Sequence, residues 1–173
     1  MTIRPAEMKD LEDIKEMYRE IIDETARQGR PIWGGDYPVE FLHEDISNKR
    51  MYILLENDRI VAAVALCHSI WDDSSVEYED GNAEARYIER LAVRPDHWRM
   101  GLSRLMMEEI EKTAREKGAE YLRLFVIESN KPAYSLYEKI GFKRIGGVHD
   151  IPVDEHFTLH TDVMEKRISR KDV

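Results

Sequence analysis

Strand-like and helix-like stretches alternate along the second half of the chain, and this alternation limits the fold more than any other feature of the sequence. Arg86–Val93 and Tyr121–Ile127 are short apolar runs typical of strands, and a stretch with helical spacing follows each of them. Pro95 ends the first strand, and Gly118 is placed to end the helix between the two strands. A strand, a helix and a second strand in this order form a crossover, so the sequence predicts an α/β domain.

The first half of the chain adds two helices and an antiparallel hairpin. Residues 51–55 and 60–68 are strand-like, and Asn57-Asp58 between them is typical of a tight turn. The predicted order is βααβββαβαββ, a central mixed sheet of six to seven strands flanked by about four helices, in a single domain over 1–173. The other elements are expected at 2–4 (strand), 11–22 and 39–47 (helices), and 142–148 and 157–166 (strands).

Composition and charge favour a globular enzyme or binding domain over other classes of protein. Apolar residues make up 42% of the chain and charged residues 35%, and the net charge is −9. This charge argues against nucleic acid as a partner. No apolar run reaches the roughly 18 residues that a membrane span needs. The only cysteine, Cys67, follows an apolar run and is expected to be buried; with no internal disulfide available, we expect a cytoplasmic protein.

The segment from Arg86 to Ser103 reads as a strand, a loop containing Gly101, and the start of a helix. A helix start presents unpaired N–H groups and a partial positive charge, which together suit a pyrophosphate. Gly101 would let such a ligand approach the backbone closely. Taken alone, one glycine before a helix is also consistent with an ordinary turn.

A second informative segment runs from Asn130 to Phe142, with the sequence Asn-Lys-Pro-Ala-Tyr-Ser-Leu-Tyr-Glu-Lys-Ile-Gly-Phe. Asn130 is a good helix N-cap, and proline is tolerated in the first turn that follows it. Tyr134 and Tyr137 lie at helical spacing, so both are also consistent with simple packing. Gly141 is placed to end the helix.

The two segments together, at this separation, resemble the Gcn5-related N-acetyltransferase (GNAT) superfamily. The pattern Asn-x-x-Ala-x-x-Leu-Tyr-x-x-x-Gly-Phe matches at every marked position, and the chain looks like a small bacterial member whose acceptor is undefined. The resemblance implies an acetyl-CoA-dependent N-acetyltransferase that moves an acetyl group to a primary amine by direct attack in a ternary complex. It also implies that no metal is needed.

The resemblance assigns roles to particular residues. Backbone groups at Leu91, Ala92 and Val93 would align the pantetheine arm, Asn130 would hydrogen-bond the CoA arm, and Tyr137 would protonate the CoA thiolate. The residues implied at the pyrophosphate are Arg99, Met100, Gly101, Leu102 and Ser103.

The phosphate loop departs from the family pattern Gln/Arg-x-x-Gly-x-Gly/Ala at two places. Trp98 replaces the Gln or Arg, and Ser103 replaces the second small residue. We expect CoA binding to be kept, because backbone N–H groups do most of the holding. The effect of the two replacements on affinity stays open.

Glu89 is the candidate base for the acceptor amine. Strand alternation would place Glu89 on the same face as Leu91 and Val93. Some family members carry the glutamate at the place of Tyr87, and an ordered water is a further alternative. An ion pair between Glu89 and Arg86 or Arg90 is an equally good interpretation.

The acceptor itself, a small-molecule or peptide amine, is not determined by the sequence. The family resemblance places the loop from Trp33 to Tyr37 beside it, and His149, Asp150 and His156 lie in or beside the last strand connection. The acidic run 72–80 is interpreted as a solvated loop, and the alternative is that it attracts a cationic amine through Asp72, Asp73, Glu77, Glu79 and Asp80. No metal-ligand spacing is found among the six histidines, and no dinucleotide or Walker motif is present. A homodimer is compatible with the resemblance. The alternative from another class is a non-catalytic acyl-CoA-binding regulatory module with the same fold.

Overall fold

The computed structural model describes residues 1–70, 73–152 and 158–169, and the chain divides into two compact units. Residues 1–66 and 89–110 form the first unit, and residues 67–88 and 111–173 form the second. The first unit begins with β1 (Thr2–Pro5), η1 (Met8–Asp10), α1 (Leu11–Arg27), η2 (Val39–Phe41) and α2 (Leu42–Ser47). It continues with β2 (Met51–Glu56), β3 (Arg59–Cys67) up to Leu66, and η3 (Pro95–His97). It also includes the end of β4 (Ala85–Val93) and the start of α3 (Leu102–Glu116). The second holds the rest of β4 and α3, with β5 (Tyr121–Ile127), α4 (Lys131–Lys139), β6 (Lys143–Pro152) and β7 (Thr158–Arg167).

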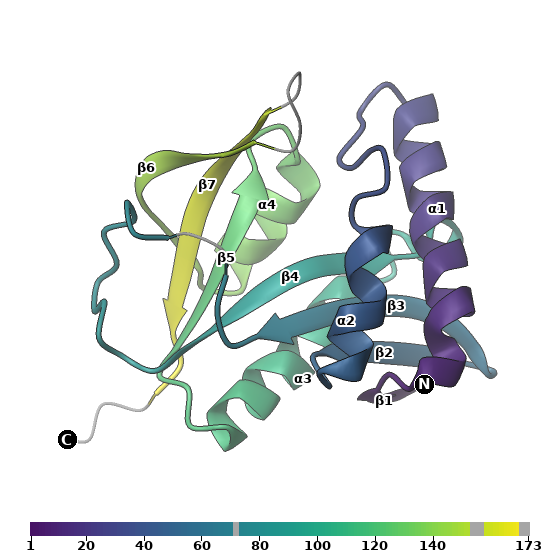
Figure 1. The fold of residues 1–173 in the computed structure, drawn as a ribbon, viewed down its shortest axis with the longest axis horizontal. Helices are drawn as coiled ribbons and strands as arrows, with labels where there is room; N and C mark the ends of the chain where they lie inside the picture. Colours follow the sequence, from purple (N-terminus) through teal and green to yellow (C-terminus); the bar gives the residue numbers. More distant parts are fainter. Residues whose placement is uncertain (71–72, 153–157, 170–173) are drawn as a thin grey trace. The chain divides into compact units, whose positions relative to one another are not determined.

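The first unit contains the strand order β1-β2-β3-β4. Strand β2 pairs antiparallel with both β1 and β3. The β2–β3 hairpin closes through Asn57 and Asp58, both of which have positive φ, of 49° and 62°. Two consecutive left-handed residues are the signature of the turn that best matches strand twist, and Asn and Asp tolerate that conformation. The hairpin is therefore as predicted, and α1 and α2 lie side by side beside it (Figure 1).

The second unit contains the strand order β4-β5-β7-β6. Strand β4 runs parallel to β5, with Ala85 opposite Tyr121, while β7 is antiparallel to both of its neighbours. Figure 1 shows β5, β7 and β6 as adjacent arrows with α4 beside them. With β4 shared by the two units, the sheet has seven strands in mixed orientation, which confirms the predicted α/β class and element order.

Helix periodicity predicts the buried side chains well, with one exception. Ile14, Met17 and Tyr18 of α1 are fully buried, as their spacing indicates, and Cys67 is buried as expected. Leu105 lies at helical spacing with Leu102 and Met106, which predicts that it faces the core with them, but its exposure is 38%. The neighbouring Met107 is buried in its place.

Helix ends follow the predicted chemistry. The side chain of Asn130 accepts a hydrogen bond from the Ala133 N–H at 3.4 Å, which makes it the N-cap of α4. Gly118 and Gly141 follow α3 and α4 with positive φ, of 81° and 95°. Glycine adopts this conformation at little cost, and it is the usual way to end a helix.

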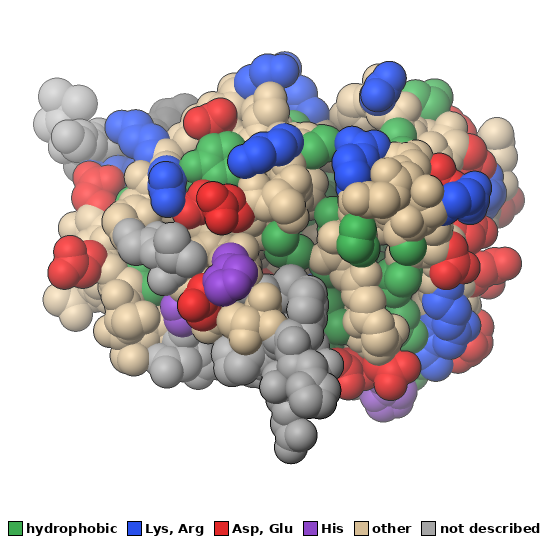
Figure 2. Space-filling view, turned by 90° about the horizontal axis from the view of Figure 1, so that it is seen from above, with side chains coloured by type: hydrophobic (Ala, Val, Ile, Leu, Met, Phe, Trp, Pro, Cys, Tyr) green, Lys and Arg blue, Asp and Glu red, His purple; other side chains and the backbone are tan. Residues whose placement is uncertain are grey.

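Acidic and basic side chains are mixed along the exposed face of α1, at the right of Figure 2. Lys15 pairs with Glu12, and Arg27 pairs with Glu24, each at 2.7 Å. Such exposed pairs contribute little to stability but keep the helix surface polar. Within the described residues, no helix has both the length and the apolar character needed to cross a membrane.

Candidate active site

Strand β4 has a break in its extended conformation at Arg90. This residue has a φ of 56°, in the left-handed region that a non-glycine residue seldom adopts. Strict alternation of side chains is therefore interrupted between Glu89 and Leu91, so the strand pattern no longer supports the prediction that Glu89 shares a face with Leu91 and Val93. The cause is local, because alternation requires every residue in the run to be extended.

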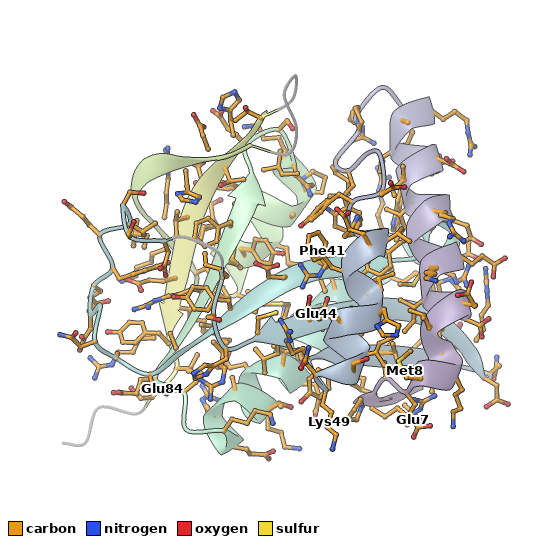
Figure 3. All side chains as sticks on the ribbon, viewed as in Figure 1. Glu7, Met8, Phe41, Glu44, Lys49 and Glu84 are labelled. Carbon is orange, nitrogen blue, oxygen red and sulfur yellow. The ribbon has the colours of Figure 1, made fainter. Side chains whose placement is uncertain are left out.

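The left-handed Arg90 is held by contacts from three other elements of the first unit. The Tyr18 hydroxyl of α1 donates to the Arg90 carbonyl. The guanidinium donates to both carboxylate oxygens of Asp45, on α2, at 2.8 and 3.0 Å. It also lies 5.4 Å from the ring centre of Phe41, the residue labelled beside α2 in Figure 3. Together these contacts fix the turn of the strand.

Glu89 accepts a hydrogen bond from the same guanidinium, from Nη1 of Arg90 to Oε2 at 2.5 Å. Its side chain is 26% exposed. Burial raises the pKa of Glu89 above its usual value of 4.5, and the charge of Arg90 opposes part of that rise. The expected ion pair with Arg90 is confirmed, whereas Arg86 pairs with Glu84 instead. A carboxylate with a raised pKa is also a better proton acceptor, so the geometry is compatible with the role of a base.

The loop before α3 has the conformation that an anion site needs. Arg99 and Gly101 have positive φ, of 66° and 81°, and α3 begins at Leu102. The first N–H groups of a helix have no partner within the helix, and those of Leu102 and Ser103 belong to this set. A Cβ added at Gly101 would meet nothing within 4 Å, so the space beside this residue is free of other protein atoms. The predicted phosphate residues therefore fit an anionic ligand.

The other predicted CoA contacts of the first unit lie just before and within this loop. Ala92 and Val93 are buried at the end of β4, and Leu91 is half-buried. Met100 is exposed, at 58%. An exposed Met beside two left-handed residues is consistent with a loop that contacts a ligand through its backbone.

Tyr137 and Asn130 lie in the second unit. Tyr137 is buried on α4, with its ring centre 5.8 Å from that of Phe142. Burial raises the pKa of its phenol, so the hydroxyl is protonated at neutral pH. Tyr137 makes no side-chain hydrogen bond to the described residues. A proton donor must be protonated and must not already donate its proton to another protein group, and Tyr137 meets both conditions among the described residues.

Tyr87, the alternative position for the base, belongs to a hydrogen-bonded cluster of the second unit. Its hydroxyl donates to Asp73 at 2.6 Å, and Tyr78 donates to the same carboxylate oxygen at 2.9 Å. Arg123 lies 3.6 Å from the ring centre of Tyr78 and pairs with the buried Glu165. Burial raises the pKa of Tyr87. Tyr87 is thus a protonated donor in this cluster, which does not favour it as a base.

The acidic run was interpreted as a solvated loop, and this is only partly correct. Glu77, Glu79 and Asp80 are exposed, but Asp73 is half-buried and accepts the two tyrosine hydroxyls. The loop is also anchored through its backbone, because the carbonyl of Asp80 accepts from Arg123 at 2.6 Å. Asp72 lies outside the described residues.

The residues expected near the acceptor lie in different parts of the chain. The Trp33 ring packs against that of Tyr18, with the ring centres 5.4 Å apart and the planes tilted by 40°. Burial raises the pKa of Tyr37. In the second unit, the His149 ring lies 5.0 Å from Phe125. His156 lies outside the described residues. In the part of the chain that the structure describes, no group of three His, Cys, Asp or Glu is placed to hold a metal ion.

Sequence reasoning missed Asp45 and the backbone turn at Arg90. Asp45 looks like an ordinary acidic residue of a short amphipathic helix, yet its side chain is 2% exposed and binds Arg90. Nothing in the sequence marks Arg90 as left-handed, since Gly or Asn is the usual signal. The structure identifies the cluster around Arg90 because it shows that the buried Asp45 pairs with this arginine.

A comparison with known families identifies the class of protein. The family model described as the acetyltransferase (GNAT) family matches residues 15–142. This range covers most of the chain, and it includes both the Gly101 loop and the Asn130–Phe142 segment. The chain therefore belongs to the GNAT family of N-acetyltransferases, as the sequence resemblance predicted.

Individual relatives are distant but cover most of the chain. An N-alpha-acetyltransferase from Saccharolobus solfataricus is 25% identical over 83% of this chain and 81% of its own. A spermidine N(1)-acetyltransferase from Thermoplasma acidophilum is 24% identical over 82% and 87%. The structure of yncA from Salmonella typhimurium with its cofactor acetyl-CoA superposes with a TM-score of 0.71 at 17% identity, covering 100% and 96% of the two chains.

The stability of the phosphate loop is expected to depend on the protonation of His97. Its two ring nitrogens lie 2.6 Å from a carboxylate oxygen of Asp96 and 2.9 Å from one of Glu56, so the protonated ring donates a hydrogen bond to each. Asp96 and then Glu56 raise the pKa of His97 above 6.5. The stabilisation is therefore complete below the unfolded value and is lost as pH rises through the higher folded pKa. Wild type should melt about 2–4 °C above His97→Gln at about pH 6, with the gap closing by about pH 9. A gap that stays constant with pH would contradict this assignment.

Proposed function

We propose that this protein transfers the acetyl group of acetyl-CoA to a primary amine by direct attack in a ternary complex. The family match over residues 15–142 carries the proposal, because it includes both segments that the chemistry requires. The presence of acetyl-CoA in the yncA structure supports the same cosubstrate here. We propose further that residues 1–173 form one acetyltransferase domain in which β4 and α3 contribute to both compact units.

CoA would be held mainly by backbone groups. In this proposal Leu91, Ala92 and Val93 align the pantetheine arm, and the run Arg99, Met100, Gly101, Leu102 and Ser103 receives the pyrophosphate. The two positive-φ residues, and the first N–H groups of α3, which have no partner within the helix, support the second assignment. Asn130 uses its carbonyl oxygen to cap α4, which leaves its amide N–H groups to donate to the CoA arm.

Glu89 and Tyr137 would carry the two protons of the reaction. Glu89 accepts the proton that the attacking amine loses, directly or through a water, as the nitrogen bonds to the thioester carbon. Tyr137 donates its hydroxyl proton to the sulfur as the carbon–sulfur bond breaks. The raised pKa of each group supports its role, since one must accept a proton and the other must hold one at neutral pH. Glu89 is preferred to Tyr87, whose hydroxyl is already donated to Asp73.

The acceptor class is the finer part of the proposal. The named relatives act on N-alpha amines and on spermidine, so a peptide α-amine and a small cationic amine are the two acceptors we propose to test. We also propose a cytoplasmic protein that acts without a metal, and a homodimer is compatible with this function. The single cysteine, which rules out an internal disulfide, is consistent with that location.

The direct test of the function is release of free CoA thiol from acetyl-CoA in the presence of amines. Polyamines, amino acids, aminoglycosides and peptides with free N-termini form the panel, and each product is confirmed by its added acetyl mass. An acetyltransferase releases thiol only when an acceptor is present. Tight CoA binding with no release on any amine would instead support the non-catalytic acyl-CoA-binding alternative.

Glu89→Gln should lower kcat by about 100-fold without changing the affinity for acetyl-CoA, because Gln keeps the shape but cannot accept the proton. In wild type, kcat should fall as pH decreases through the raised pKa of Glu89, and this acidic limb should disappear in the variant. Steady-state kinetics from about pH 5 to 9, with calorimetry for acetyl-CoA, measures both effects.

Asp45→Asn is the matched control for Glu89→Gln. It removes the other carboxylate that binds Arg90, but it does not remove the proposed base. If Glu89 acts only by holding Arg90, the two variants should lose similar activity. We expect Asp45→Asn to destabilise the fold more and to lower kcat of the folded fraction by less than about tenfold.

Tyr137→Phe should reduce kcat by about 10- to 1000-fold while leaving the melting temperature nearly unchanged, because only the hydroxyl is removed and the ring packing stays. Tyr134→Phe, on the same helix, is the control for a general effect of losing a hydroxyl. Full turnover of Tyr137→Phe on a good acceptor would assign Tyr137 to packing and the proton to solvent.

A further inference from the structure

Four side chains in the segment between β4 and α3, those of Arg94, Asp96, His97 and Trp98, make contacts within the first unit. Arg94 is 4% exposed, and its Nε donates to the Ile60 carbonyl at 2.6 Å. Its backbone N–H donates to Val61, and its guanidinium pairs with Glu20 of α1 at 2.5 Å. The start of the loop is thus tied to both β3 and α1.

The middle of the same loop is tied to the β2–β3 hairpin. His97 lies between Asp96 and Glu56, and Asp96 also pairs with Arg59 at 2.6 Å. Glu56 and Arg59 flank the tight turn at Asn57 and Asp58, so a rigid part of the sheet supports the loop.

Trp98 closes the loop back onto the strand from which it comes. Its indole N–H donates to the carbonyl of Val93 at 2.7 Å. Val93 is the last residue of β4, and Trp98 is followed by the two left-handed residues, Arg99 and Gly101. A side-chain hydrogen bond therefore closes over the four residues between Val93 and Trp98, just before the turn into α3.

The indole has a single N–H donor and no acceptor, and the Val93 carbonyl already uses that donor. Trp98 therefore has no donor left for a phosphate. A Gln or Arg in its place would keep several. The Trp98 side chain therefore holds the conformation of the loop and does not donate a hydrogen bond to the ligand.

We propose that Trp98 is a positioning residue for CoA. Its bond to Val93 sets the distance between the strand end that aligns the pantetheine arm and the helix start that receives the pyrophosphate. A ligand that uses both must match that distance, and ordering the loop before binding removes an entropic cost from binding. The inference rests on the proposed function, because it concerns the same CoA site.

Trp98→Phe tests the inference, since it keeps an aromatic ring and removes the only donor. Calorimetry should give a Kd for CoA about 3- to 10-fold higher than wild type, the loss expected of one hydrogen bond. In the acetyl-transfer assay, the KM for acetyl-CoA should rise by a similar factor, while the acceptor KM and kcat at saturation stay within about twofold. If Trp98 has only a structural role, the variant should have a lower melting temperature, and the KM for acetyl-CoA should not rise selectively over the KM for the acceptor.

Hydrogen exchange of the indole N–H gives a second test on the unmutated protein. The sequence has three tryptophans, and Trp98→Phe identifies the Trp98 signal by deleting it. We expect this proton to be protected in the CoA-free protein, because the bond to Val93 is made before binding. Exchange at the rate of an exposed indole would overturn the inference, and so would an unchanged Kd in Trp98→Phe. Wild type that fails to bind CoA would instead overturn the proposed function, so the two failures are distinct.

Discussion

The left-handed turn of Arg90 is the constraint on which the candidate site depends. A non-glycine residue in that conformation is unfavourable by about 1 kcal/mol or more and persists only when its surroundings hold it. Here α1 holds the carbonyl through Tyr18, and α2 holds the guanidinium through Asp45. The turn separates Glu89 from the extended end of β4, so one strand carries both the proposed base and the run of backbone that is proposed to align CoA.

The same cluster explains how a carboxylate can be held in a partly buried position without being neutralised. Burial alone disfavours the charged form of Glu89, and Arg90 restores part of the balance. Because Arg90 is shared with Asp45, the positive charge is divided between two carboxylates. Glu89 is therefore oriented by its partner while its pKa stays raised, a combination that suits a proton acceptor better than a full ion pair would.

The sequence was sufficient for the features that depend on local chemistry. Periodicity and turn residues predicted the order of the elements, and Asn57-Asp58, Gly118 and Asn130 act at the positions that their backbone preferences indicate. The missed features involve partners distant in sequence. Asp45 meets Arg90 across 45 positions, and no local pattern predicts that contact or the φ that it stabilises. The exposed Leu105 has a related cause, because which side of a helix is covered depends on the packing of the fold and not on periodicity alone.

The net charge of −9 raises the question of how such a chain would hold a polyanion, and the phosphate loop contains the answer. Long-range attraction does not help, so the local field must be positive by itself. Arg94 and His97 lie in the loop, but their charges are directed to Glu20, Asp96 and Glu56. They therefore shape the backbone and add little free positive charge. Within this described loop, the N–H groups at the start of α3 and the exposed Arg99 are the groups proposed to meet an anion, and in that proposal affinity depends on loop geometry more than on charge. If the loop binds CoA as proposed, it gains most from being ordered beforehand, and the side-chain bonds of Arg94, His97 and Trp98 would supply that order.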